Sequence, residues 1–314
     1  MRKGKFVLLL ICLFFIFQLS FSQSSGELKS KIKLDTSYNH GKDIYALASA
    51  GNNLAFGDEN GDLFLINSNL NVLNIATGIS LWVNCLAVNS SNSILVAGCS
   101  EGDLYFHNIT NNSEIKRLKL TKAAIKAVKF LSDSAILAAS DKLYLININS
   151  GNVIKSFDFG IKILSLEIEN SAKTVYVGLE DGKIMIFDAV KFKPLKNLTK
   201  HKRGVTAISI SEDKKELITG DASGLVYVWT LKSGKAVKSI SAHIDEISSL
   251  LFSPDKKYII TAGWDKNIFI WDRKKYILEL NINAHKNIVT SVIFWNGKLV
   301  TAGYDNNIKI WSNF

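Results

Sequence analysis

The sequence repeats itself at a nearly constant interval. Similar segments end at Asn67, Asn108, Asn147, Asp188, Thr230, Asp272 and Ser312. Successive copies therefore lie 39 to 42 residues apart. In a chain with such a period each copy forms one structural unit, and neighbouring units bury their apolar faces against each other. Seven copies account for almost all of the 314 residues, so no second globular domain is expected.

Each copy favours strands rather than helices. In the sixth copy the apolar segments are 247–252, 258–261, 268–271 and 277–282, with turn residues between them at 254–255 and 264–267. Four short strands with turn residues between them predict a four-stranded antiparallel unit. No longer window has convincing helical periodicity. The predicted fold is all-β, a seven-bladed β-propeller of four-stranded antiparallel blades.

The first strand of every copy carries a small residue at the same position. These residues are Ala46, Cys85, Ala127, Ser165, Ala207, Ser249 and Ser291. Because the innermost strands converge on the axis of a propeller, small side chains are expected there. Cys85 is interpreted as filling such a position; the alternatives are a reactive thiol or a disulfide with Cys99.

The ends of the chain predict how the ring closes. A strand candidate at 28–34 precedes the first copy, and the chain ends directly after the third strand of the last copy. Residues 28–35, at the start of the mature chain, are free to supply the missing outer strand of the last blade. Such pairing removes exposed strand edges and predicts a closed, monomeric ring.

The N-terminus resembles a secretory signal peptide. Arg2, Lys3 and Lys5 precede an apolar stretch at 6–17, and Ser20 and Ser22 follow it. We expect cleavage after Ser22, a mature propeller domain at 23–314, and a periplasmic or secreted location. The alternative is a retained membrane anchor, but twelve residues span about 18 Å as a helix, against roughly 30 Å of hydrocarbon. No stable membrane insertion is expected after cleavage.

The charge balance is moderately basic. The chain has 38 Lys and Arg residues against 28 Asp and Glu residues, and removal of 1–22 leaves a net charge of +7. This charge is compatible with weak attraction to anionic partners but is no sign of nucleic-acid binding by itself. Nucleic acid is therefore not predicted as a partner.

The last three copies resemble the WD40-repeat family. That family commonly has a hydrogen-bond network of His before the first strand, Ser or Thr on the second, Asp in the following turn and Trp on the third. The resemblance assigns this network to His243, Thr261, Asp265 and Trp271, and to His285, Thr301, Asp305 and Trp311. The fifth copy offers His201, Thr219 and Trp229, but has Ser223 at the Asp position, so its network is expected to be incomplete.

The first four copies depart from the pattern. They have Ile66, His107, Ile146 and Phe187 where Trp is expected, and only His40 keeps the His position. Those blades are expected to be held by apolar burial alone, and His107 is interpreted as a core histidine.

Catalytic chemistry is not indicated. The sequence has no P-loop, no Gly-x-Ser-x-Gly and no dinucleotide fingerprint, and its regularly spaced histidines would be distributed around the ring. We therefore predict no catalytic residue, no cofactor and no metal. Carboxylates in the turns between second and third strands leave open an axial cation or paired-carboxylate site, against ordinary turn chemistry.

Two surfaces are candidates for binding a partner. Trp264 and Tyr304 precede turn aspartates on one face, where exposed aromatic side chains would anchor a protein; the alternative is packing between neighbouring loops. The opposite face carries a basic sector formed by Lys191, Lys193, Lys214, Lys215, Lys232, Lys256, Lys257, Arg273, Lys274 and Lys275. That sector would suit an acidic protein or anionic lipid, or is simply a solvated face.

The function predicted from these features is a non-enzymatic WD40 scaffold for protein–protein interaction in the bacterial envelope. A signal peptide on a stand-alone ring is also similar to the WD40-like accessory proteins encoded with periplasmic nitrate reductases. The alternative is a propeller enzyme with an axial metal or quinone site, similar to lactonases or quinoproteins. The partner, the binding face and any pathway stay open.

Overall fold

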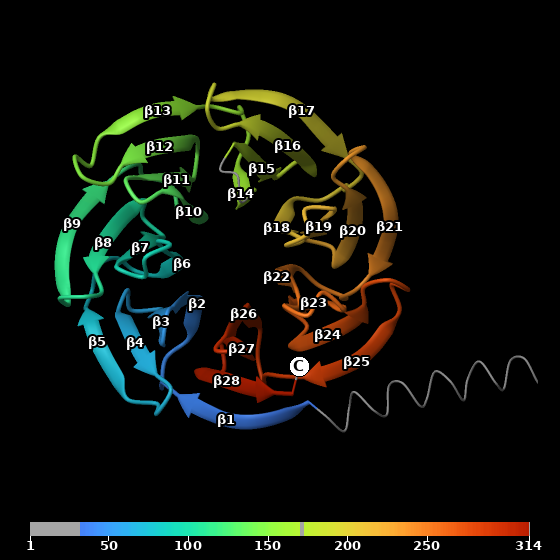
Figure 1. Cartoon of the computed structure of the whole chain (residues 1–314). Helices are drawn as coiled ribbons and strands as arrows, with labels where there is room; N and C mark the ends of the chain where they lie inside the picture. Colours follow the sequence, from blue (N-terminus) through green and yellow to red (C-terminus); the bar gives the residue numbers. More distant parts are fainter. Residues whose placement is uncertain (1–31, 170–172, 314) are drawn as a thin grey trace, which may run out of the picture.

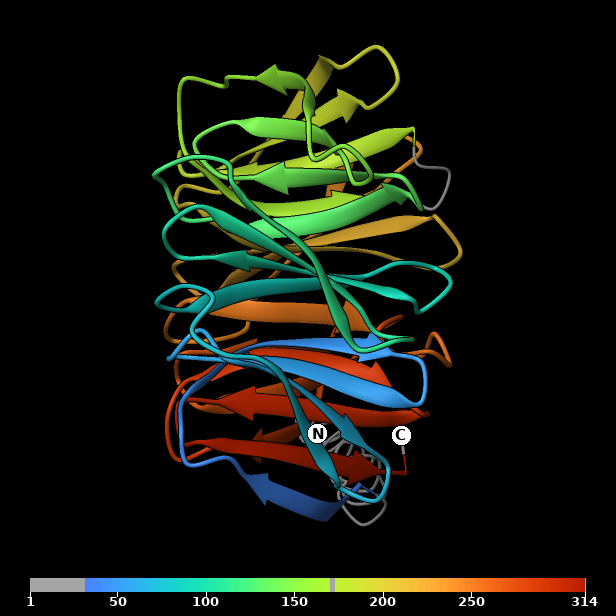
Figure 2. The same ribbon diagram turned by 90° about the vertical axis from the view of Figure 1, so that its left-hand side faces the viewer.

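The chain forms seven four-stranded sheets arranged as blades around a central axis (Figure 1). The computed structural model describes residues 32–169 and 173–313. Seen from the side, the blades make a disc whose connecting loops lie on two opposite faces (Figure 2). All strand pairs within the blades are antiparallel, so the predicted seven-bladed all-β propeller is confirmed. No described residue belongs to a helix that could cross a membrane.

The strands of the first four blades run in sequence from the axis outward. Blade 1 contains β2 (Ile44–Ala50), β3 (Asn53–Asp58), β4 (Leu63–Asn67) and β5 (Val72–Ala76). Blade 2 contains β6 (Val83–Val88), β7 (Ile94–Cys99), β8 (Asp103–Asn108) and β9 (Ser113–Lys119). Blade 3 contains β10 (Ala127–Ser132), β11 (Ala135–Ala139), β12 (Leu143–Asn147) and β13 (Val153–Phe157). Blade 4 contains β14 (Ile163–Ile168), β15 (Thr174–Leu179), β16 (Lys183–Asp188) and β17 (Lys193–Thr199).

The remaining blades follow the same order except at the ring closure. Blade 5 contains β18 (Val205–Ile210), β19 (Glu216–Asp221), β20 (Leu225–Thr230) and β21 (Lys235–Ser241). Blade 6 contains β22 (Ile247–Phe252), β23 (Tyr258–Gly263), β24 (Asn267–Asp272) and β25 (Leu278–Asn283). Blade 7 contains β26 (Val289–Trp295), β27 (Lys298–Gly303), β28 (Asn307–Ser312) and, as its outer strand, β1 (Lys33–Asn39).

The ring closes through the N-terminal strand, as predicted. β1 pairs antiparallel with β28, from Lys33 opposite Ser312 to Asn39 opposite Asn307. The pairing strand is 33–39, so it overlaps the predicted segment 28–35 at 33–35; residues 28–31 of that segment lie outside the described residues. Asp35 fixes this register at one end, because its carboxylate accepts hydrogen bonds from Lys298 at 2.6 Å and from Ser312.

The hydrophobic core lies between the blades. The buried apolar residues form seven clusters, and each joins two neighbouring sheets. Between blades 6 and 7, for example, Ile260 and Ile270 pack in one cluster with Val292 and Leu299. Such clusters explain why single repeats cannot fold alone: each sheet buries its faces only against its neighbours.

Side chains on the innermost strands tie adjacent blades together. Thr206 Oγ1 donates a hydrogen bond to the carbonyl of Ile247 in the next blade, at 2.6 Å. Ser248 donates to Val289 in the same way, and Thr290 donates to Ile44 across the ring closure, at 2.7 Å. Each donor sits at a β-bulge, which turns its side chain toward the neighbouring strand. The small residues that recur in the first strand of every blade line an axial cavity of about 540 Å³.

The two described cysteines are both free thiols. Burial raises the pKa of each thiol, that of Cys99 to about 12. Thiols of this kind are protonated and unreactive at neutral pH. Cys85 therefore fills its small axial position, and the alternative disulfide with Cys99 is not formed.

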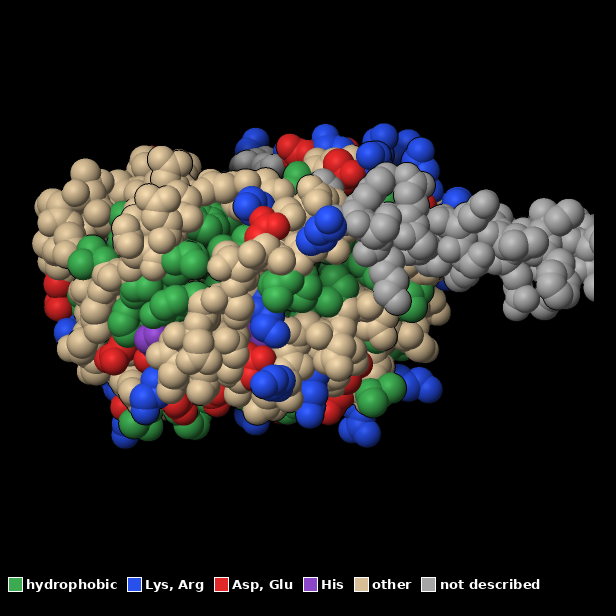
Figure 3. Space-filling view, turned by 90° about the horizontal axis from the view of Figure 1, so that it is seen from below, with side chains coloured by type: hydrophobic (Ala, Val, Ile, Leu, Met, Phe, Trp, Pro, Cys, Tyr) green, Lys and Arg blue, Asp and Glu red, His purple; other side chains and the backbone are tan. Residues whose placement is uncertain are grey.

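The rim of the disc is built from the outer strands. Figure 3 looks at the rim on the side of β1, where hydrophobic side chains gather in the middle and charged ones lie mainly toward the margins. On the outer strands, Leu34 of β1 and Leu73 of β5 are about half exposed. Single apolar side chains of this kind are normal on a protein surface.

Candidate functional site

The three C-terminal blades contain buried chains of hydrogen bonds. In blade 6, His243 Nδ1 lies 2.8 Å from Asp265, Thr261 donates to His243 Nε2 at 2.9 Å, and Trp271 Nε1 donates to Thr261 at 3.1 Å. Each buried polar atom thereby has a partner. In blade 7 the corresponding contacts join His285 to Asp305 and Thr301, and Trp311 to Thr301.

Blade 5 forms a complete network with a different carboxylate. His201 Nδ1 lies 2.7 Å from Asp221, Thr219 donates to His201 Nε2 at 2.7 Å, and Trp229 Nε1 donates to Thr219 at 2.9 Å. The expectation of an incomplete network was wrong, because Asp221 at the end of β19 reaches the ring that Ser223 was expected to face. Ser223 instead donates to Asp221 at 2.7 Å.

Blade 1 also has a polar contact, so its predicted reliance on apolar burial alone was wrong. His40 Nε2 lies 3.0 Å from Asp58, which occupies the same strand-end position as Asp221. The sequence signal was the Gly-Asp pair that ends the second strand in both blades. Phe56 replaces the threonine there, and His40 packs edge-on against its ring.

In blades 2, 3 and 4 the residues at the Trp position are fully buried. These residues are His107, Ile146 and Phe187. His107 Nε2 lies 3.0 Å from Asn112 Oδ1, and burial lowers the pKa of His107. It is a core histidine, as interpreted from the sequence.

A glycine turn in one blade positions the histidine of the next. Gly224 has a φ of +82°, and a Cβ placed there would lie 2.1 Å from the carbonyl oxygen of His243. The carbonyl of Gly224 in turn accepts the backbone N–H of His243 at 3.0 Å. Only glycine combines this backbone conformation with so close an approach.

The network carboxylates predict loss of stability in acid. Burial favours their protonated form, but hydrogen bonds from histidine and backbone N–H outweigh it, so the pKa values of Asp221, Asp265 and Asp305 are lowered. The unfolded chain therefore takes up protons first as the pH falls, and the free energy of unfolding should decline from about pH 4 toward pH 2. Urea unfolding at several pH values measures this. A constant free energy from pH 5 to pH 2 would contradict it.

The basic sector lies on the face formed by the turns between first and second and between third and fourth strands. Lys214, Lys215, Lys256, Lys257, Lys274 and Lys275 are exposed. Two of them have carboxylate partners: Lys256 pairs with Glu212 at 2.9 Å and Lys257 with Asp255 at 3.3 Å. Part of the positive charge of this sector is thus neutralised locally.

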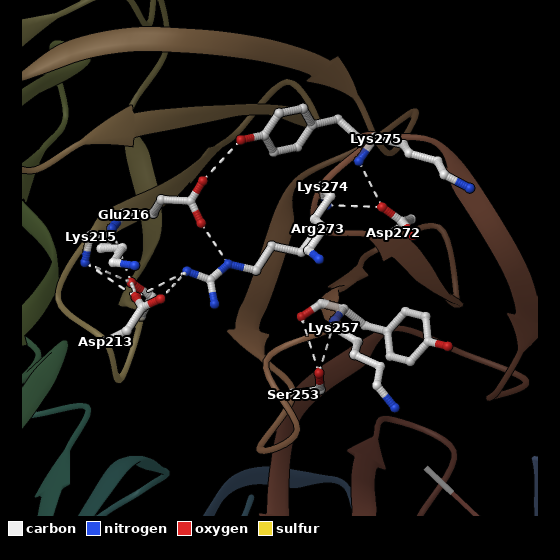
Figure 4. Close-up of polar contacts among 12 residues, drawn as sticks. Asp213, Lys215, Glu216, Ser253, Lys257, Asp272, Arg273, Lys274 and Lys275 are labelled. Atoms are coloured by element: carbon white, nitrogen blue, oxygen red, sulfur yellow. Dashed lines mark hydrogen bonds and ion pairs between the residues drawn. The ribbon is translucent and has the colours of Figure 1, made fainter.

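Arg273 does not belong to this surface. It is 8% exposed and joins blade 6 to blade 5 (Figure 4). Its Nε donates to Glu216 at 2.6 Å, and its terminal nitrogen donates to Asp213 at 3.0 Å. Its guanidinium also lies over the ring of Phe252, 4.8 Å from the centroid. The prediction of Arg273 as a partner-binding residue was wrong, because its charge is satisfied within the ring.

Aromatic side chains gather on the opposite face. This face is formed by the loops that lead into each inner strand and the turns between second and third strands, which hydrogen bond to one another. Trp264 lies there, 42% exposed, and Tyr304 is half-buried. Tyr304 packs on Tyr45 with 4.7 Å between ring centroids, and Tyr45 stacks on Trp82 at 5.9 Å. We call this surface, which includes Tyr304, Tyr45, Trp82 and Trp264, the aromatic face.

The sequence interpretation missed two residues of this run. Tyr45 lies at the bulge of β2, and Trp82 directly precedes the first residue of β6. Tyr45 follows the buried Ile44 and Trp82 precedes the buried Val83, each at the start of an inner strand. An aromatic residue directly beside this buried position is the signal that could have found them. Trp82 is 46% exposed, with Leu81 beside it at 57%.

The axial cavity brings together hydroxyl, lysine and carboxylate side chains without a metal-type cluster. Lys129 of blade 3 pairs with Glu167 of blade 4 at 2.8 Å in its wall. Across 32–169 and 173–313, no group of three or more His, Cys, Asp or Glu side chains could hold a metal ion.

The sequence matches one family profile. The profile describes the β-propeller of nucleolar protein 10-like N-terminal domains, and it matches residues 39–271 and, in a second alignment, 128–309. No curated protein sequence matches the chain.

Solved structures share the fold at low sequence identity. A chain in the crystal structure of the mitotic checkpoint complex has a TM-score of 0.81 and 19% identity, over 89% of this chain and 91% of that one. The WD40 β-propeller domain of Doa1 has a TM-score of 0.79 and 16% identity, over 90% of this chain and 97% of that one.

Proposed function

Because this chain belongs to the family of nucleolar protein 10-like N-terminal β-propeller domains and has a WD40 propeller fold, we propose that it is a non-enzymatic scaffold that binds other proteins. WD40 propellers generally serve protein–protein interaction, but a fold alone does not define a function. The proposal therefore depends on a specific surface.

The observation that carries this proposal is the aromatic run on the aromatic face, in which Trp82 is 46% exposed and Tyr45 and Tyr304 are half-buried. Tyr304, Tyr45 and Trp82 come from blades 7, 1 and 2, and their rings follow one another across the blade boundaries. Exposed Trp and Tyr side chains on a rigid support are typical of protein-binding hot spots. Leu81, which precedes Trp82 in the chain, and Trp264, on the same face in blade 6, are also substantially exposed.

Crosslinking and pull-down from the native host test this function. Replacement of Trp82 by alanine should reduce the capture of a specific partner by about tenfold or more, since hot-spot truncation typically costs at least about 2 kcal/mol. The double variant Lys256→Glu/Lys257→Glu changes the other face and serves as the matched control. Capture that falls with the lysine variant and not with Trp82→Ala would move the binding surface to the basic sector.

We further propose that the scaffold acts outside the cytoplasm, in the bacterial envelope. The support is the basic and apolar N-terminal segment at 1–22, which lies outside the described residues. N-terminal sequencing of protein from a periplasmic fraction tests this, with a mature chain that begins at Gln23 as the expected outcome. A role beside a periplasmic nitrate reductase is a narrower proposal, tested by whether that enzyme is the captured partner.

A further inference from the structure

We propose that the aromatic face binds a basic peptide segment, in which Lys or Arg side chains lie beside the run formed by Tyr304, Tyr45 and Trp82. This inference rests on the proposed scaffold function and adds the chemistry of the partner. It is carried by the position of acidic side chains around the aromatic rings.

The rings form a continuous contact surface beside the axial cavity. Tyr45 lines the cavity from β2, and Trp82 of blade 2 and Tyr304 of blade 7 lie on either side of Tyr45. Tyr45 and Trp82 are nearly parallel, with an interplanar angle of 6°. Faces of aromatic rings attract the cationic groups of Lys and Arg.

Carboxylates border this run without lysine partners. Asp43 directly precedes β2, and the backbone N–H of Glu59 donates to the Asp43 carbonyl at 3.0 Å. Asp245 and Glu246 directly precede β22 in blade 6, and the carbonyl of Glu246 accepts the backbone N–H of Trp264 at 2.9 Å. Within the described parts of the chain, none of these four carboxylates forms an ion pair.

The carboxylates of blade 4 on the same face are arranged differently. Glu180 pairs with Lys162 at 3.2 Å, and Asp181 pairs with Lys183. Negative charge is therefore compensated there from within the protein. On the side of blades 6, 7 and 1 the four carboxylates named above have no such ion pair among the described residues, and this contrast favours a cationic partner.

The electrostatics of the two carboxylates nearest the rings agree with this reading. Burial and then the neighbouring Glu59 and Asp305 raise the pKa of Asp43. Burial raises the pKa of Glu246, Lys126 opposes the shift, and Asp245 adds to it. Both Asp43 and Glu246 act on Tyr304, whose pKa is raised mainly by burial and by its hydrogen bond with Tyr45. A ligand cation would relieve this unfavourable accumulation of charge.

The test uses a random library of twelve-residue peptides selected on the immobilised chain. The enriched peptides should contain more Lys and Arg than the starting library. The best of them, labelled with fluorescein, should bind about three- to tenfold more weakly to Asp43→Asn and to Glu246→Gln. Its affinity should fall as NaCl is raised, and a version with every Lys and Arg changed to Glu should not bind.

Two controls separate loss of binding from loss of folding. Because the pKa of each carboxyl is raised in the folded state, the charged form costs stability as the pH rises through that value. Asp43→Asn and Glu246→Gln should therefore leave the melting temperature at pH 7 unchanged or higher. Lys256→Glu on the other face should leave peptide affinity unchanged.

The outcomes distinguish this inference from the proposed function. Enriched peptides that depend on Trp82 but carry no excess of Lys and Arg, or that bind Asp43→Asn and Glu246→Gln as tightly as the native chain, would overturn the inference and leave the scaffold function standing. Failure to enrich any peptide, or peptide binding that is indifferent to Trp82→Ala, would also overturn the inference, whereas the scaffold function is overturned only if the pull-down captures no specific partner.

Discussion

Replacing Arg273 with alanine should lower the free energy of unfolding by about 3 kcal/mol, because it leaves two carboxylates without their buried counter-charge. Asp213 and Glu216 lie in blade 5, and Arg273 is the residue through which blade 6 neutralises them. Its removal also takes away the contact with the ring of Phe252. The pKa of Asp213 is held down to about 2, first by Ser211 and, against burial, by Arg273. The ion pair is therefore present throughout the neutral range.

Urea unfolding measures this change in the free energy of unfolding, and two further variants serve as comparisons. Lys274→Ala changes the adjacent exposed residue and should alter the free energy by no more than about 0.5 kcal/mol. Arg273→Lys keeps the charge but cannot reach both carboxylates with one planar group, so an intermediate loss is expected. A loss below about 1 kcal/mol for Arg273→Ala would mean that solvent screens the pair.

Thr261→Val should cost about 2–4 kcal/mol, although it preserves the size of the side chain. The Thr261 hydroxyl donates to His243 and accepts from Trp271, and all three groups are buried. Valine leaves the imidazole nitrogen and the indole N–H without partners, and each unsatisfied buried group costs about 1–3 kcal/mol. This penalty exceeds any gain from burying an extra methyl group.

A double-mutant cycle identifies the cause of that loss. Trp271→Phe removes the indole N–H, so its cost should be smaller in the Thr261→Val background than in the native chain. Thr110→Val, in an exposed turn, is the matched control and should change the free energy by no more than about 0.5 kcal/mol. Additive effects of Thr261→Val and Trp271→Phe would show that the two groups do not share one network.

Much of the architecture follows from the order of residues alone. A period of about 41 residues with four apolar segments per copy permits few folds other than a ring of blades, and seven copies fix the number of blades. The histidine, threonine and tryptophan of blades 5 to 7 could be assigned because those copies resemble WD40 repeats, in which each of these residues has a fixed place. The closing strand was also predictable, because the last copy lacked an outer strand and the start of the chain contained a strand candidate that belonged to no copy.

Contacts between blades could not be obtained in the same way. Asp221 and Ser223 are two residues apart, and only the course of the turn decides which carboxylate or hydroxyl reaches His201. Arg273 sits among lysines in the sequence, yet it points into the boundary with blade 5, where its partners lie 57 and 60 residues away. Tyr45 and Tyr304 become neighbours only when the ring closes, and Tyr45 and Trp82 only when blades 1 and 2 pack side by side. Periodicity determines which residues form each unit, whereas the relative placement of units determines which charges are neutralised and which rings meet, because those energies depend on distances through space.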